Sequence, residues 1–119
     1  MGLDFWIEKK RKGNAYSTLA WENAHEPWRN CHTVKRIFCE TIETNDTYIY
    51  PITIGAMQVI VKKLSEELQE EDFNDIENID YSYTRKLLIA IKDLCTIIND
   101  EIWNNKQGIE YDYRVIDDF

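Results

Sequence analysis

The chain has 119 residues, of which 44% are hydrophobic and 13% aromatic, enough for the core of one domain without disulfide bonds. Its ordinary content of large apolar residues argues against general disorder despite a net charge of −8, and three cysteines without a C-x-x-C pair indicate reduced thiols. No apolar run approaches the roughly 20 residues of a membrane-spanning helix, and the first residues lack the order of a signal peptide, so we expect a soluble intracellular protein.

The first third of the chain predicts a strand followed by a helix. LDFWIEK, residues 3–9, is rich in strand-forming residues and is followed by a basic cluster and Gly-Asn. STLAWENAH, residues 17–25, can form a short helical turn capped by Ser17 or Thr18. Because proline suits the first turn of a helix, we expect a new helix to run from near Pro27 to about residue 44. Apolar residues at three- and four-residue steps mark its buried face: Trp28, Cys31, Val34, Phe38 and Ile42.

The rest of the chain predicts two longer helices between strands. TYIYPI, residues 47–52, is typical of a short strand, and Thr53 can cap the next helix. The buried face of that helix consists of Met57, Val61, Leu64 and Leu68. The longest helix is predicted over residues 81–104 and ends before Gly108. IEYDYRVID, residues 109–117, alternates like a half-buried strand and can pair with the first strand.

These elements predict one α+β domain over residues 1–119, in which three main helices pack on a small antiparallel sheet and helix dominates. The alternative is an all-α bundle whose two terminal segments are ordered arms. No internal repeat or linker divides the chain.

The stretch HEPWRNCH, residues 25–32, gathers candidate metal ligands. His32 and Cys39 are seven residues apart, roughly 10 Å along a helix and too far for one tetrahedral ion, and adjacent Cys31 and His32 diverge by about 100°. His25 precedes the helix and can fold back toward either residue. We therefore predict a possible structural zinc site from His25, Cys31 and His32. It needs further ligands, for which the candidates are Asp4, Glu22 and Cys95. The alternative is buried thiols and surface histidines.

Motifs for catalysis are missing from the sequence. It contains no G-x-S-x-G, no H-E-x-x-H, no P-loop and no Rossmann glycine pattern, and four glycines leave no phosphate-cradling loop. We therefore predict no catalytic residues and a protein that is not an enzyme. A small metalloenzyme or zinc-binding domain that uses residues 25–39 is the alternative hypothesis.

Acidic residues are concentrated in the second half of the chain. Residues 1–63 carry nine Lys and Arg against seven Asp and Glu, whereas residues 64–119 carry five against fifteen. Such a density repels phosphates and attracts basic protein surfaces, so we expect no direct binding of nucleic acid. Aromatic side chains among the acids make a plausible contact face. The predicted partner-binding residues are Glu66, Glu67, Glu70, Glu71, Asp72, Asp75, Glu77, Asp80, Tyr111, Asp112, Asp117 and Asp118.

Several motifs resemble a family of small uncharacterised phage and prophage proteins that begin MGLDM followed by an aromatic residue. The matching stretches are MGLDFWI (residues 1–7), PWRNCHTVKRIF (27–38), YIYPITIGAMQVIVKKL (48–64) and, more loosely, IDYSYTRKLLIAIKDL (79–94). Lys35 replaces the histidine that the family typically carries in the W-R helix. That departure weakens a metal role shared across the family.

The resemblance implies a phage origin and a place in the cytoplasm of the bacterial host, but no activity. At the level of class, small acidic phage proteins without catalytic motifs are similar to anti-CRISPR proteins. This similarity implies an inhibitor of a nucleic-acid-handling host defence protein, with Cas9 as the first candidate, that blocks access of DNA. The partner would be a basic protein, because the channel of such a nuclease is positively charged, and no membrane is involved. A self-assembling phage accessory protein is a further hypothesis.

Overall fold

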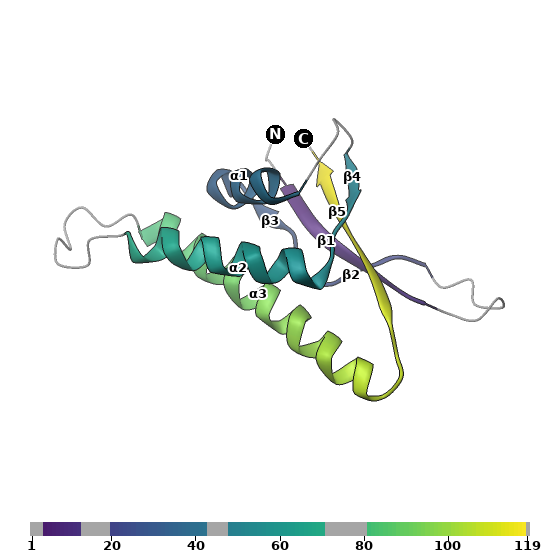
Figure 1. The fold of residues 1–119 in the computed structure, drawn as a ribbon. Helices are drawn as coiled ribbons and strands as arrows, with labels where there is room; N and C mark the ends of the chain where they lie inside the picture. The colour runs from purple at the N-terminus through teal and green to yellow at the C-terminus, as the bar shows by residue number, and fades with distance from the viewer. Residues whose placement is uncertain (1–3, 13–19, 43–47, 71–80, 119) are drawn as a thin grey trace.

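The computed structural model describes residues 4–12, 20–42, 48–70 and 81–118 (Figure 1). It confirms the predicted α+β class, since three helices pack on a five-stranded antiparallel sheet, and the all-α alternative is wrong. None of the helices in these ranges combines the length and apolar character needed to cross a bilayer. In chain order the elements are β1 (Asp4–Arg11), β2 (Glu22–Asn23), β3 (Trp28–Arg29), α1 (His32–Thr41), β4 (Ile49–Pro51), α2 (Ile54–Gln69), α3 (Tyr81–Lys106) and β5 (Tyr111–Asp118).

The sheet is built on the pairing of its first and last strands. β1 and β5 are antiparallel partners over eight positions, from Asp4 opposite Asp118 to Arg11 opposite Tyr111, which confirms the predicted pairing. The strand order is β2-β1-β5-β4, and β3 pairs with the start of β1. Figure 1 shows β1 and β5 side by side at the centre of the sheet. The pairing holds the two ends of the described chain together.

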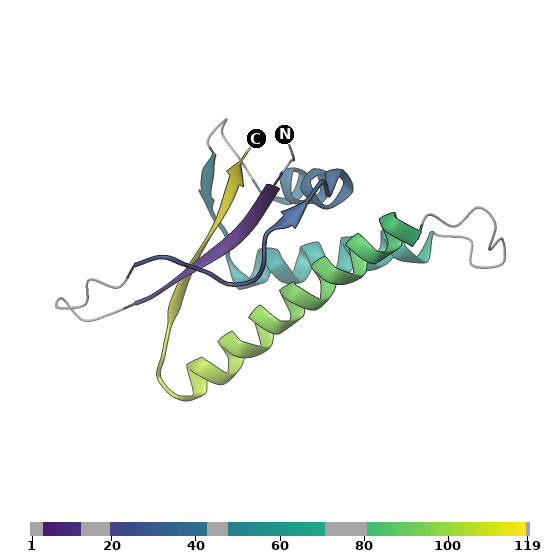
Figure 2. The same ribbon diagram turned by 180° about the vertical axis from the view of Figure 1, so that it is seen from behind.

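The core lies between one face of the sheet and the helices. Alternate strand residues face inward, and α2 and α3 form an antiparallel hairpin across that face (Figure 2). Phe5 of β1 contacts the ring of Phe38 of α1 with centroids 5.4 Å apart. The largest fully buried side chains are Phe5, Ile7, Val34, Ile37, Phe38, Met57, Ile60, Leu64, Leu87, Leu94 and Val115.

The prediction for the region before α1 is wrong. The helix predicted from Pro27 begins only at His32, because Trp28 and Arg29 pair with Phe5 and Asp4 as strand β3. Asn30 has a φ of 53°, a left-handed conformation that ends the strand. As a strand residue Trp28 reaches Phe5, with ring centroids 5.0 Å apart, and the core gains an aromatic pair.

The helical turn predicted over residues 17–25 is wrong where it can be compared with the structure. Glu22 and Asn23 form strand β2 and pair with Lys9 and Glu8. The proposed caps, Ser17 and Thr18, lie outside the described residues, as does the predicted end of the first helix near residue 44.

The boundaries of the two long helices agree with their sequence signals. The Thr53 hydroxyl accepts a hydrogen bond from the Ala56 backbone N–H at 3.1 Å, the contact expected of an N-cap. α3 runs to Lys106, slightly beyond the predicted residue 104. Gly108 follows with a φ of 74°, a conformation that glycine adopts without strain.

Candidate functional site

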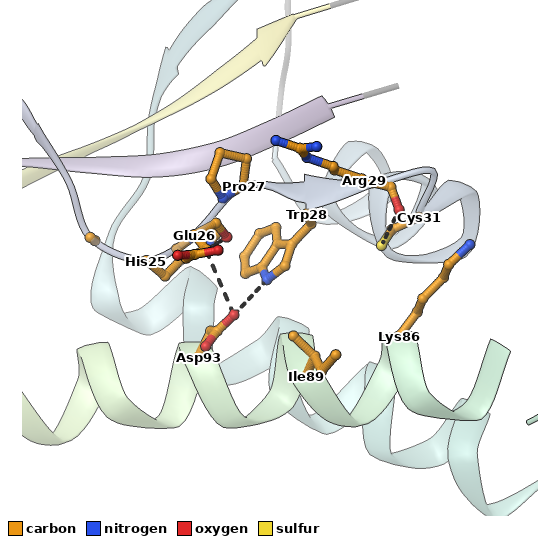
Figure 3. Close-up of a pocket in the computed structure, with 10 residues that line it drawn as sticks. His25, Glu26, Pro27, Trp28, Arg29, Cys31, Lys86, Ile89 and Asp93 are labelled. Atoms are coloured by element: carbon orange, nitrogen blue, oxygen red, sulfur yellow. Dashed lines mark hydrogen bonds and ion pairs between the residues drawn. The ribbon is translucent and has the colours of Figure 1, made fainter. Parts of the chain in front are cut away.

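Residues 24–29 and Cys31 line a cleft of about 710 Å³ against α3 (Figure 3). The cleft lies between the short strands that precede α1 and one side of the long helix. Much of the HEPWRNCH stretch therefore faces a cavity, together with α3 residues more than fifty positions later. The lining residues are Ala24, His25, Glu26, Pro27, Trp28, Arg29, Cys31, Lys86, Ile89 and Asp93.

His25 uses both of its ring nitrogens within the fold. Its Nε2 accepts a hydrogen bond from the Ile7 backbone N–H at 3.1 Å, so a neutral ring carries its hydrogen on Nδ1. Nδ1 lies 2.6 Å from the Glu26 carbonyl oxygen and donates to it. The side chain is 4% exposed and stacks on Trp28 with centroids 4.0 Å apart. Burial lowers the pKa of His25, against the opposing effects of the Glu26 carbonyl and the Asp93 charge.

Asp93 connects the strand segment to α3. Its Oδ2 accepts a hydrogen bond from Trp28 Nε1 at 2.9 Å and lies 3.7 Å from His25 Nδ1, and Figure 3 shows both contacts. Cys31 Sγ donates to the Arg29 carbonyl oxygen at 3.3 Å. Burial raises the pKa of this thiol, so it stays protonated at neutral pH. These contacts fix the wall of the cleft.

The predicted zinc ligands are not brought together. His25 has no free nitrogen, Cys31 is a hydrogen-bonded thiol, and His32 is exposed on the first residue of α1. Among the described residues, no group of three or more His, Cys, Asp or Glu side chains could hold a metal ion. The zinc hypothesis therefore stays a prediction that has no ligand set in this part of the chain.

Three of the predicted acidic contact residues lie at the end of α2. Glu66 and Glu70 are exposed there. Glu67 is held, because Arg36 Nη2 donates to its Oε1 at 2.6 Å and the Tyr83 hydroxyl to its Oε2 at 3.1 Å. The other acids of this run lie outside the described residues: Glu71, Asp72, Asp75, Glu77 and Asp80.

The predicted contact residues of β5 lie elsewhere and have basic neighbours. Asp112 is 3.6 Å from Lys12 Nζ, and Lys9 Nζ lies over the Tyr111 ring at 5.3 Å from its centroid. Figure 1 shows that β5 and the end of α2 are well separated, so among the described residues the acids of α2 and those of β5 do not form one surface.

Asp117 does not belong to an exposed contact face. It is buried, because it shares the inward side of β5 with Tyr113 and Val115, and its Oδ2 lies 3.3 Å from Lys35 Nζ. Asp118 ends the strand, and its side chain lies outside the described part.

Sequence reasoning missed three side-chain hydrogen bonds made by Arg36 and Tyr113. Arg36 bridges two helices, since its Nη1 donates to Glu40 at 2.8 Å while its Nη2 donates to Glu67. The Tyr113 hydroxyl donates to Glu101 Oε2 at 2.6 Å inside the fold. Burial and the nearby carboxylate raise the pKa of Tyr113. The (i, i+4) spacing of Arg36 and Glu40 was a usable signal, but the other contacts depend on tertiary packing.

Comparison with models of protein families, with curated proteins and with solved structures finds no match to this chain.

Proposed function

We propose that the protein acts by binding, without catalysis, and that its partner is a basic protein surface. The contact region is the acidic end, which we define as residues 66–80. One observation carries the proposal: the chain places eight carboxylates and no Lys or Arg in this run, which joins two helices of one hairpin. Figure 1 shows that the end of α2 and the start of α3 both lie at the end of the hairpin distant from β5.

Exposure of the described residues supports the acidic end as the contact region. Glu66 and Glu70 are exposed at the last turn of α2, where their charges can act on a partner. Asp112 and Asp117 are each close to a lysine and Glu67 is paired with Arg36, which partly cancels the charge of these three carboxylates, whereas no ion pair is found for Glu66 or Glu70 among the described residues. Electrostatic attraction therefore favours approach of a cationic groove to the hairpin end over approach to the sheet.

The resemblance to phage proteins selects the kind of partner. A phage protein that binds a basic groove without turnover fits the role of an inhibitor of a nucleic-acid-handling defence protein. Cas9 is the first candidate, because its channel holds the guide and target backbones with positive charge. An acidic protein in that channel would exclude DNA.

The test is inhibition of DNA cleavage by the Cas9–guide RNA complex, together with the binding affinity. The variant Glu66→Gln/Glu70→Gln/Glu71→Gln/Asp72→Asn removes four charges from the acidic end. A matched control, Glu22→Gln/Asp100→Asn/Glu110→Gln/Asp112→Asn, removes four exposed charges elsewhere. We expect the first variant to lose about tenfold or more in affinity and the control less than about threefold. Equal losses, or no binding by the unaltered protein, would contradict the proposal.

A further inference from the structure

The outward side of α3 carries most of the exposed large apolar side chains in the described ranges. Leu88, Ile89, Ile102 and Trp103 are between 41% and 64% exposed, and Ile89 lies at the edge of this side, where it also lines the cleft beside Trp28. Figure 1 shows the second half of α3 at the lower edge of the molecule, and Figure 2 shows α3 in front of α2. Exposed apolar clusters of this kind mark interaction surfaces more often than scattered single residues do.

These side chains follow a heptad spacing. Leu88, Cys95 and Ile102 are seven residues apart, and Ile89, Thr96 and Trp103 repeat the same steps on the adjacent line. Residues seven apart on an α-helix lie nearly in one line, with a drift of about 20° per heptad. The core-facing residues Leu87, Ala90, Leu94 and Ile97 occupy the opposite side. The two lines therefore form a second contact face, separate from the core.

Cations alternate with the apolar pairs along this face. Arg85, Lys92 and Lys106 are exposed, and helical geometry places them between the two apolar lines. Along the helix, Arg85 precedes the first apolar pair, Lys92 lies between the two pairs, and Lys106 follows the second pair. Asp93 and Asp100, seven apart, lie on the flank toward β3, where Asp93 accepts the Trp28 hydrogen bond. In a chain of net charge −8, this face is basic and apolar.

The positions of the charges on this face indicate what kind of ligand it binds. Two α3 helices packed by this face would oppose cation to cation, so a second copy is disfavoured. A helix that lies on a membrane keeps its cations on the polar face, whereas here they lie within the apolar one, where insertion would bury them. An acidic amphipathic helix satisfies both features, since its carboxylates pair with the cations and its apolar residues cover the exposed pairs.

We propose that the outward face of α3, residues 85–106, is a second binding site whose ligand is an acidic amphipathic helix of a partner protein. The face spans about 21 residues, roughly 31 Å at 1.5 Å per residue, so the partner helix has about six turns. This site is distinct from the acidic end and has the opposite charge preference.

The probe is a synthetic helical peptide of about 22 residues, three heptads long, with Leu at positions a and d and Glu at e and g. A matched peptide carries Lys in place of Glu. Fluorescence anisotropy should show binding of the Glu peptide and none of the Lys peptide. Leu88→Asp/Ile102→Asp should weaken binding about tenfold or more, whereas Val59→Asp, which alters an exposed apolar residue of α2, should not. Circular dichroism checks that each variant is folded.

A charge exchange separates recognition from general apolar adhesion. The variant Arg85→Glu/Lys92→Glu should no longer bind the Glu peptide and should bind the Lys peptide instead. Equal binding of both peptides to the unaltered protein, or binding of neither, would overturn the inference. So would a concentration-dependent dimer in sedimentation velocity that Leu88→Asp/Ile102→Asp abolishes, because a second copy would then be the occupant.

Discussion

Removal of the Tyr113 hydroxyl tests the contact that joins α3 to the sheet. The hydroxyl donates to Glu101 Oε2 at 2.6 Å, and the two residues are 7% and 9% exposed. A hydrogen bond to a charged group contributes about 1.5–3 kcal/mol, and loss of the donor leaves the buried carboxylate without that partner. We therefore expect Tyr113→Phe to lower the free energy of unfolding by about 2 kcal/mol.

The expected change in melting temperature follows from chain length. An unfolding entropy of about 2.1 cal/mol/K per residue gives roughly 0.25 kcal/mol/K for 119 residues, so a loss of about 2 kcal/mol lowers Tm by about 8 °C. Urea and thermal denaturation followed by circular dichroism measure both quantities. Tyr111→Phe removes a half-buried hydroxyl from the same strand and should cost less than about 0.5 kcal/mol.

A double-mutant cycle isolates the pair. Glu101→Leu combined with Tyr113→Phe removes both partners and should cost less than the sum of the two single changes. A coupling energy near zero, or a loss below about 0.5 kcal/mol for Tyr113→Phe alone, would refute the view that this hydrogen bond holds α3 against β5.

Four further predictions concern pH dependence and helix termini. His25 has a folded-state pKa below its ordinary value of 6.5, so the unfolded chain binds the proton first and stability should fall as pH drops below about 6.5. His25→Gln should reduce this pH dependence in urea titrations. Thr53→Ala should cost about 1 kcal/mol through loss of the N-cap. Gly108→Ala should cost about 1 kcal/mol, all from the backbone at φ 74°, since a Cβ there meets nothing within 4 Å. Gly55→Ala, inside α2, should instead stabilise by about 0.5–1 kcal/mol in the same assay.

The sequence predicts the elements whose signals are local. Apolar periodicity identifies α2 and α3, and the cap at Thr53 and the turn at Gly108 are set by the conformational preferences of single residues. Strand β3 was missed because Trp28 and Cys31 fit a helical spacing, while the pairing that places Trp28 in a strand is made by Phe5, distant in sequence. Local patterns cannot distinguish these two arrangements.

The residues of the candidate sites also include some that a local pattern could predict and some that it could not. The inward position of Asp117 could have been predicted, since it has the same parity on the strand as Tyr113 and Val115, but the count of acids in the tail concealed it. The part of the cleft that α3 forms could not have been predicted, because 65 positions separate Trp28 from Asp93 and only tertiary packing joins them. The acids of residues 66–70 and those of β5 all belong to the acidic second half of the sequence, but they lie on separate parts of the fold.

The most direct test of the proposed acidic contact is the salt dependence of the rate of association with the Cas9–guide RNA complex, measured by stopped-flow fluorescence. Attraction by the acidic end predicts a rate that falls about tenfold or more between about 0.05 M and 0.5 M salt, because screening shortens the reach of the charges. It also predicts that the variant with four charges removed from residues 66–72 associates slowly at both concentrations. A rate independent of salt, or one that the variant leaves unchanged, would contradict the account.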